Sequence, residues 1–475
     1  MHFSHLHSQH FNKIAAKLTG AAELQGWQLS ALEDFWIRLQ QDETKLVKLL
    51  NGEDPPDKPG NVEFGWVLFV LNHPPLALEG LLKLLETLGL EIPPSQITKA
   101  DLARWHHTLE TTGVSDSEGE MIQEAKYASL DPGWAYSLIL YILYKLDIGS
   151  YQKADFGNLP QTIQFSGNTL KIAILGDWGT GKWQDGSDAN GPAIAVRDKA
   201  ASLDPDIAIH LGDVYYAGTE DGVFGIGSGE EEDNFVTLWK PARLGNFTLN
   251  SNHEMYDGGN GYFSVALKAA AFRQQNGTSY FALEFGNWLI LGLDSAYSDP
   301  SHLYMDGAIN EQQIQFIQGL PLAGKRIVVM THHNPIDYKG TTIVNQGKPD
   351  CLWQQVSDAL GRAPDFWYWG HLHNGIAYSD QSITGPSTYG RCVGHGAFPF
   401  GLAYGLLSDS DDPGSAPIPS VDYFAHTPIK SPTVKQQKRV YNGFAMITLG
   451  ADSLKEAFYE LGSRGAVWEK TITVI

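Results

Sequence analysis

Four short apolar runs in the later part of the chain are each followed by residues that can bind metal ions or transfer protons. The runs are Leu170 to Leu175, Ile207 to Leu211, Ile327 to Met330 and Phe366 to Trp369. Each is continuous and rich in β-branched or aromatic residues, which is typical of strands in a sheet that is covered on both faces. Residues that follow the carboxyl ends of such strands meet at one edge of the sheet. The chain is therefore predicted to be an α/β protein with polar side chains gathered at one edge.

Five motifs supply these polar residues. In chain order they are Gly176-Asp177-Trp178-Gly179, Gly212-Asp213-Val214-Tyr215-Tyr216, Asn252-His253-Glu254, Thr331-His332-His333 and Gly370-His371-Leu372-His373. Taken alone, most have an ordinary explanation, such as a helix cap for Asp213. Together, Asp, Asn, Tyr and His without a thiolate favour iron, zinc or manganese. Two such ions about 3.5–4 Å apart hold a phosphoryl group between them and generate a hydroxide nucleophile, which is the chemistry of a hydrolase.

The first motif has a competing interpretation. Residues Gly176 to Lys182 follow a strand and match a phosphate-binding loop, except that Trp183 stands where that loop has Ser or Thr. The loop needs this hydroxyl for magnesium, and it needs a helix to begin at once so that backbone amides face the phosphates. The chain continues instead with turn residues from Gln184 to Pro192. Asp177 is therefore interpreted as a carboxylate ligand that follows a strand.

The charge of the chain restricts its partners. With 33 Lys and Arg against 54 Asp and Glu, the net charge is −21 at pH 7, which argues against broad affinity for nucleic acid or anionic lipid. The two cysteines, Cys351 and Cys392, provide no disulfide framework. The amino terminus lacks the apolar stretch of a secretory signal, and no apolar run reaches the about 20 residues that cross a bilayer. We expect a cytoplasmic protein that does not enter a membrane and acts on a small phosphorylated substrate.

Two domains are predicted. Residues 1 to 150 contain amphipathic stretches separated by breaks with Pro or Gly, which favours a helical domain of unknown role. The stretches are Ala31 to Leu50, Leu76 to Leu88, Thr98 to Leu109 and Pro132 to Leu146. Gly149 to Gly167 is expected to be a linker, and the second domain is expected from residue 168 to residue 475. Near its end, three further strands are predicted to complete a second sheet: Gly443 to Leu449, Ala457 to Leu461 and Ala466 to Ile475.

The five motifs carry a resemblance to a known family. Residues 168 to 475 resemble the calcineurin-like metallophosphoesterases, and within them the purple acid phosphatase branch, with all five motifs in the same order. The superfamily usually begins with Asp-x-His, whereas this chain has Asp177-Trp178-Gly179. The lost His is matched by a Tyr in the second motif, Gly212-Asp213-x-x-Tyr216, as in the purple branch. The resemblance implies a four-layer α-β-β-α sandwich, here preceded by the all-α N-terminal domain.

The resemblance also implies the ligands of a dinuclear metal centre. The first ion, usually ferric iron in the family, would be held by Asp177, Asp213, Tyr216 and His373. The second ion, iron, zinc or manganese, would be held by Asp213, Asn252, His332 and His371, with Asp213 as the bridge. His253 would contact the phosphate and protonate the leaving oxygen. Because a free Tyr has a pKa near 10, Tyr216 binds as a phenolate only beside a strong Lewis acid, which independently favours ferric iron.

Two motifs depart from the family pattern or leave a choice. Ser251 precedes Asn252 where the family usually has Gly, which alters the turn without removing the ligand. The fourth motif offers both His332 and His333, and His332 is preferred because of its spacing from Val329.

A glycine-rich stretch, Tyr389 to Gly396, follows the last motif. It contains Arg391 and His395, which are candidates for substrate contact, and a turn between strands is the alternative interpretation. The predicted function is the hydrolysis of phosphate esters, above all phosphomonoesters, by a metal-bound hydroxide. The alternatives are a phosphodiesterase with the same metal centre, or a metal-binding scaffold whose N-terminal helices recognise a protein partner.

Overall fold

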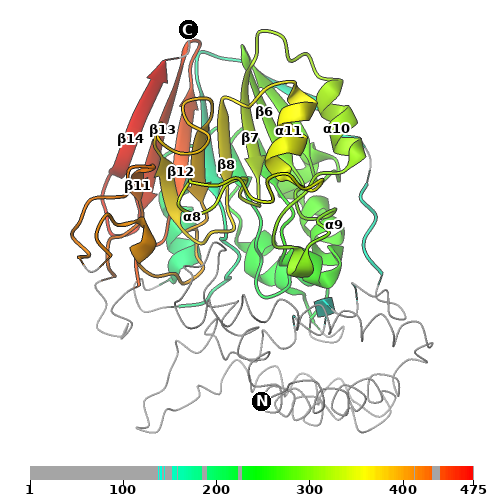
Figure 1. Cartoon of the computed structure of the whole chain (residues 1–475). Helices are drawn as coiled ribbons and strands as arrows, with labels where there is room; N and C mark the ends of the chain where they lie inside the picture. The colour runs from blue at the N-terminus through cyan, green and yellow to red at the C-terminus, as the bar shows by residue number, and fades with distance from the viewer. Residues whose placement is uncertain are drawn as a thin grey trace, which may run out of the picture.

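A computed structural model of the chain describes residues 152–473, with gaps at 158, 185–189, 223–226, 411 and 430–438, together with Ser137, Leu140, Tyr141 and Tyr144. In this part of the chain, strands form two mixed sheets and helices lie against them (Figure 1). The predicted α/β class is confirmed. The predicted helical stretches Ala31 to Leu50, Leu76 to Leu88 and Thr98 to Leu109 lie outside the described residues.

The first sheet has six strands in the order β14-β13-β12-β2-β3-β4. Its parallel half consists of β2 (Leu170–Leu175), β3 (Ile207–His210) and β4 (Gly245–Thr248). Its antiparallel half consists of β12 (Gly443–Leu449), β13 (Ser453–Glu460) and β14 (Ala466–Thr473). Because β12 pairs with β2, the C-terminal strands complete the sheet that contains β2 and β3.

The second sheet has eight strands in the order β1-β5-β6-β7-β8-β10-β9-β11. In chain order they are β1 (Thr162–Phe165), β5 (Phe281–Phe285), β6 (Trp288–Leu293), β7 (Arg326–Thr331), β8 (Phe366–Trp369), β9 (Gly375–Tyr378), β10 (Tyr389–Val393) and β11 (Val421–Phe424). Two of these strands differ from expectation. The four residues of β1 form within the expected linker and pair with β5 at the edge of the sheet. β10 replaces the expected glycine-rich loop or turn, because it pairs with both β8 and β9.

Two of the α-helices begin at local sequence signals. The described α-helices are α8 (Pro192–Ser202), α9 (Asn260–Ser264), α10 (Glu311–Gln318) and α11 (Leu352–Leu360). α8 starts with a proline, and the side chain of Asn310 caps α10 by accepting a hydrogen bond from Gln313 N. Short segments complete the list: the π-helical η4 (Glu231–Phe235) and the 3-10 segments η5 (Val236–Leu238), η6 (Glu254–Asp257), η7 (Ala266–Lys268), η8 (Ala270–Gln275), η9 (His302–Tyr304) and η10 (Tyr404–Leu406). Among the described residues, no helix has the length and apolar character needed to cross a bilayer.

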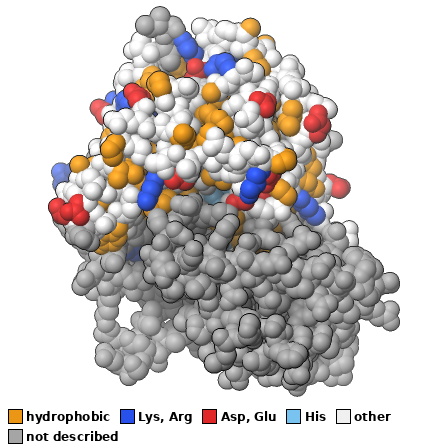
Figure 2. Space-filling model, in the orientation of Figure 1, with side chains coloured by type: hydrophobic (Ala, Val, Ile, Leu, Met, Phe, Trp, Pro, Cys, Tyr) orange, Lys and Arg blue, Asp and Glu red, His pale blue; other side chains and the backbone are white. Residues whose placement is uncertain are grey.

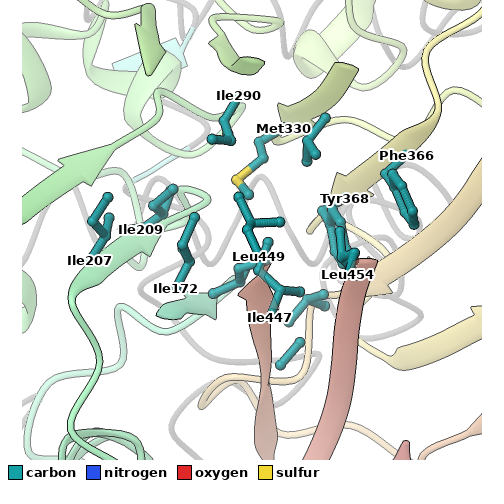
Figure 3. Packing of buried hydrophobic residues seen from close by; sticks show 14 of the residues in the cluster. Ile172, Ile207, Ile209, Ile290, Met330, Phe366, Tyr368, Ile447, Leu449 and Leu454 are labelled. Carbon is teal, nitrogen blue, oxygen red and sulfur yellow. The ribbon is translucent and has the colours of Figure 1, made fainter. Parts of the chain in front are cut away.

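The main hydrophobic cluster lies between the two sheets. Ile172 and Ile209 from the six-stranded sheet pack near Ile290 and Met330 from the eight-stranded sheet (Figure 3). A second cluster joins the outer face of the eight-stranded sheet to α10 and α11, and a third joins the six-stranded sheet to α8. The central strands β2, β3, β6, β7 and β8 are therefore buried on both faces, which explains why they are largely apolar runs, whereas the edge strands β1 and β14 are partly exposed.

The outer surface carries mixed charge. On the face shown in Figure 2, acidic and basic side chains of the described residues are interspersed with apolar and neutral ones. This face therefore presents no continuous basic surface among the residues that the structure describes.

Candidate metal centre

The residues that follow the strands of both sheets meet in the interior of the protein. Asp177 follows β2, Asp213 follows β3, Asn252 follows β4, His332 follows β7, and His371 and His373 follow β8. Each of these side chains is at most 5% exposed. Four of them also adopt a positive φ angle, which is uncommon for residues other than glycine: Asp177, Asp213, His371 and His373. Backbone strain of this kind is typical of ligand-binding sites.

One group of donor atoms surrounds His332 Nε2. This nitrogen lies 2.8 Å from Asn252 Oδ1, 3.1 Å from Asp213 Oδ1 and 3.2 Å from His371 Nδ1. The amide nitrogen of Asn252 is turned away, because it donates to Tyr256 Oη at 3.1 Å. The side-chain oxygen of Asn252 therefore faces the imidazoles.

The tautomers of the two imidazoles decide what this group can bind. His332 Nδ1 lies 2.8 Å from Leu211 O, and His371 Nε2 lies 3.1 Å from Met305 O. Because a carbonyl oxygen only accepts, the neutral rings carry their protons on these outer nitrogens and direct lone pairs inward. Burial, together with the nearby His333 and His332, lowers the pKa of His371 well below its usual range, so this ring is neutral. Lone pairs that converge with no proton between them repel one another. A cation bound among them would be coordinated by these lone pairs and would remove the repulsion. The donor set fits a metal ion.

A second group surrounds His373 Nε2. The hydroxyl of Tyr215 lies 2.9 Å from this nitrogen, Asp177 Oδ1 lies 3.2 Å from it and Asp213 Oδ2 lies 3.5 Å from it. Asp213 thus presents Oδ1 to one group and Oδ2 to the other. Carboxylate, imidazole and phenol oxygen and nitrogen atoms suit iron, zinc or manganese. The two groups therefore share one carboxylate, that of Asp213.

The buried carboxylates of the centre favour a bound positive charge. Burial, with Asp213 beside it, raises the pKa of Asp177 to about 7. Burial alone would lower the pKa of His332, but the carboxylate of Asp213 outweighs it and raises that pKa. Two buried carboxylates are costly without a counter-charge. A bound cation would remove both shifts by stabilising the ionised carboxylates and the neutral imidazole.

The second motif differs from the expected arrangement in one respect. The hydroxyl of Tyr215 lies 2.9 Å from Asp213 Oδ2 and at the same distance from His373 Nε2. Tyr216, the tyrosine named by the motif spacing, is 9% exposed, and its backbone carbonyl accepts a hydrogen bond from His253 Nδ1 at 2.6 Å. The structure therefore places the Tyr215 hydroxyl within the donor group, which the motif spacing did not predict.

The adjacent histidines of the fourth motif, His332 and His333, contact different groups. His333 Nε2 donates to Tyr304 O at 2.7 Å, and its Nδ1 lies 2.9 Å from Ser295 Oγ. His332 faces the carboxylate and amide oxygens instead. Asp177, Asp213 and His332 place ligand atoms within 4.8 Å of one another, as do His332, His333 and His371. His332 thus belongs to both of these three-residue sets, whereas His333 belongs to one.

Residues 170–375 match the family model described as calcineurin-like phosphoesterase. This part of the chain belongs to that family. All the donor residues described above lie within the matched segment, from Asp177 to His373. No curated protein matched the sequence.

Solved structures with a similar fold include phosphatases and other proteins. A purple acid phosphatase from yellow lupin (Lupinus luteus) seeds is 14% identical, with a TM-score of 0.40 over 64% of this chain and 54% of that one. The chain thus spans about half the length of the lupin enzyme. GAP50, the anchor in the inner membrane complex of Plasmodium, is 13% identical, with a TM-score of 0.42 over 65% of this chain and 90% of that one. PhoD is 13% identical, with a TM-score of 0.40 over 67% of this chain and 70% of that one. These are distant similarities, and the family assignment rests on residues 170–375.

Two residues to which the sequence analysis assigned no ligand role, Ser251 and Glu254, hold Asp213 in place. Ser251 Oγ lies 2.5 Å from Asp213 Oδ1, and the carboxylate of Glu254 accepts a hydrogen bond from Asp213 N at 3.2 Å. Gly212 makes room for them, since its φ is 96° and an added Cβ would lie 2.7 Å from the Cβ of Ser251. In the sequence, the only indication of this contact was Ser251 itself, which stands where the family usually has glycine.

The two candidates for substrate contact are buried between the two sheets. Arg391, on β10, is fully buried, and its Nε donates to Glu456 Oε2 on β13 at 2.8 Å. His395 is also fully buried, and its ring lies between Gly375 and Gly443, near Phe458. Burial lowers the pKa of His395 to about 3, so its imidazole is neutral. These placements give both residues packing contacts between the sheets, and we do not assign them to substrate.

Proposed function

We propose that the chain hydrolyses phosphate esters, with phosphomonoesters as substrates, at a centre of two metal ions. The observation that carries this proposal is the convergence of donor atoms on His332 Nε2 and His373 Nε2, with the carboxylate of Asp213 shared between them. When bound, two cations would activate water and neutralise charge that develops on the phosphoryl group. The family assignment supports the same class of reaction.

The first ion would be held by Asp177, Asp213, His373 and one tyrosine of the pair Tyr215 and Tyr216. The second ion would be held by Asp213, Asn252, His332 and His371. We assign ferric iron to the first position, because a phenolate ligand requires a strong Lewis acid. Iron, zinc or manganese suits the second position, where the donors are oxygen and imidazole. This assignment follows the resemblance of the motifs to the purple acid phosphatase branch.

His253 is the proposed proton donor to the leaving oxygen. Its Nδ1 faces the carbonyl of Tyr216 at 2.6 Å, so Nδ1 keeps its proton and Nε2 is the nitrogen that exchanges one. The ring packs against Tyr215 and Tyr256, with centroid distances of 4.6 Å and 4.9 Å, which fixes its orientation. It also adjoins Asn252 in the chain. A protonated imidazole held beside the centre is suited to general acid catalysis.

Removal of the metals is expected to abolish activity and to lower thermal stability. The purified full-length chain should release p-nitrophenol from p-nitrophenyl phosphate, and the rate should fall to the buffer blank after dialysis against EDTA and recover when metals are restored. The Tm should fall after EDTA treatment, because the buried Asp177 and Asp213 lose their counter-charge and a ligand that binds only the folded state stabilises it.

The substrate class is tested in parallel with bis(p-nitrophenyl) phosphate. Hydrolysis of the diester alone would replace the monoesterase with a phosphodiesterase that uses the same residues. A protein that retains two metals and hydrolyses neither ester would contradict the proposed enzyme and favour a scaffold.

The two tyrosines provide a spectroscopic prediction. If ferric iron occupies the first position, a tyrosinate-to-iron absorption band should be visible, and Tyr215→Phe should remove it because the Tyr215 hydroxyl lies 2.9 Å from both Asp213 Oδ2 and His373 Nε2. Tyr216→Phe is the matched control and should retain the band. Loss of the band in Tyr216→Phe alone would show that the motif spacing, and not the observed contact, identifies the ligand.

A further inference from the structure

Four helical residues that precede the family-matched segment lie close to the loops around the proposed metal centre. Ser137, Leu140, Tyr141 and Tyr144 are helical and recur at intervals of three and four residues, so they lie on one face. They fall within the predicted helix Pro132 to Leu146. Ser137, Leu140 and Tyr141 are at most 4% exposed. This face is therefore covered, although it precedes the segment that matches the phosphoesterase family.

Tyr141 contacts two separate loops. Its hydroxyl accepts a hydrogen bond from Leu303 N at 3.1 Å. Its ring meets Tyr304 edge-on at 5.7 Å and Tyr256 edge-on at 5.9 Å between centroids. The side chain is fully buried, and burial raises the pKa of its phenol above the usual range, so the hydroxyl stays protonated. One tyrosine thus links the loop after β4 to the loop after β6.

The first of these loops orients a proposed ligand of the second ion. Tyr256 Oη accepts a hydrogen bond from Asn252 Nδ2 at 3.1 Å. This bond turns Asn252 Oδ1 toward His332 Nε2, 2.8 Å away. Tyr141 packs edge-on against the Tyr256 ring, whose hydroxyl accepts this bond.

The second loop fixes the tautomer of another proposed ligand. Leu303 and Tyr304 have φ angles of 53° and 52°, an uncommon conformation that neighbouring contacts must maintain. The following residue, Met305, accepts a hydrogen bond from His371 Nε2 at 3.1 Å through its carbonyl. That bond places the proton of His371 on Nε2 and leaves Nδ1 to face the centre. Tyr141 supports the strained part of the loop through its bond to Leu303 N.

We propose that Tyr141 is a positioning residue that supports the occupancy of the second metal position. The inference rests on the proposed two-metal function, since it assigns Asn252 and His371 to the second ion. Neither residue belongs to the proposed ligand set of the first ion, which is Asp177, Asp213, His373 and a tyrosine. Loss of the Tyr141 contacts should therefore weaken the second position and leave the first unchanged.

The test is a zinc titration of the full-length chain after complete removal of metal, read as zinc bound per chain at buffered free Zn²⁺. Tyr141→Ala should weaken the second of two binding steps by about 10-fold, the lower end of the range for loss of an outer partner of a metal ligand, because Tyr141 acts on Asn252 and His371 only through the two loops. Tyr141→Phe keeps the ring and removes the hydroxyl that bonds to Leu303 N, so it should weaken the same step less. Excess Zn²⁺ should restore full occupancy in both variants.

Tyr423→Phe is the matched control, because it also removes one buried tyrosine hydrogen bond, here to Glu460 on β13. It should leave both binding steps unchanged. The proposal for Tyr141 is overturned if a folded Tyr141→Ala protein binds zinc as the wild type does, or if both steps weaken equally. If Tyr141→Ala does not fold, unchanged binding by Tyr141→Phe overturns it. A wild-type chain that binds fewer than two ions overturns the two-metal function itself and this inference with it.

Discussion

Replacing Asp213 with Asn is expected to abolish phosphate ester hydrolysis and to remove at least one metal ion per chain. The two carboxylate oxygens of Asp213 face different donor groups, 3.1 Å from His332 Nε2 and 3.5 Å from His373 Nε2. An amide exchanges one of these oxygens for a nitrogen that only donates hydrogen bonds and does not bind a cation. Metal cations contribute several kcal/mol to the transition state, and each about 1.4 kcal/mol is tenfold in rate. The expected loss of kcat is at least about 10³-fold.

Two measurements check this result. The rate of p-nitrophenol release and the metal content per chain are compared for the wild type, Asp213→Asn and Asp422→Asn. Asp422 is an exposed residue that pairs with Lys470, so its variant should match the wild type in both. Full activity in Asp213→Asn, or its usual two metals, would contradict the bridging role.

Replacing Arg391 with Met is expected to destabilise the fold while leaving the chemistry of the centre intact. Arg391 on β10 and Glu456 on β13 are fully buried and join the two sheets across the main core. Tyr368 Oη also donates to this carboxylate at 2.9 Å, and Arg391 Nη1 donates to the carbonyl of Tyr378 at 2.9 Å. Removing the guanidinium leaves Glu456 charged and buried, which costs about 3–5 kcal/mol for a pair of this kind.

A double variant separates this structural role from the substrate contact suggested by the sequence. Chemical denaturation should show a much smaller loss of stability for Arg391→Met combined with Glu456→Met, because no uncompensated charge remains. KM for p-nitrophenyl phosphate should not change in the folded fraction of either protein. An increase in KM at wild-type stability would restore Arg391 as a substrate-binding residue.

The strand ends were predictable from the sequence because the strands are buried on both faces. Phe366 to Trp369 and Gly443 to Leu449 coincide with β8 and β12, and Ile207 to Leu211 differs from β3 by one residue. Ile207 to Leu211 and Phe366 to Trp369 are largely apolar segments, and each is followed by one glycine and then by Asp213 or His371. Such a pattern is typical of a buried strand that leaves the core, so it indicates both the strand and the position of the polar side chains that follow it.

Other parts were hidden because their signal is not local. β1 is a four-residue edge strand with partly exposed residues, and its pairing with β5 depends on a segment more than a hundred residues away. Arginine is a common phosphate-binding residue, so the sequence suggested that role for Arg391. Its burial is explained by Glu456 on the opposite sheet, which lies far away in the sequence. The choice between Tyr215 and Tyr216 depends on the direction of a side chain within a turn, which spacing alone does not determine.

The most direct test of the two-metal centre is anomalous X-ray diffraction from crystals of the full-length chain loaded with zinc. We expect two peaks on either side of Asp213, one among Asp177, His373 and a tyrosine, and the other among Asn252, His332 and His371. A single peak, or a second peak held by His333 in place of Asn252, would contradict the account.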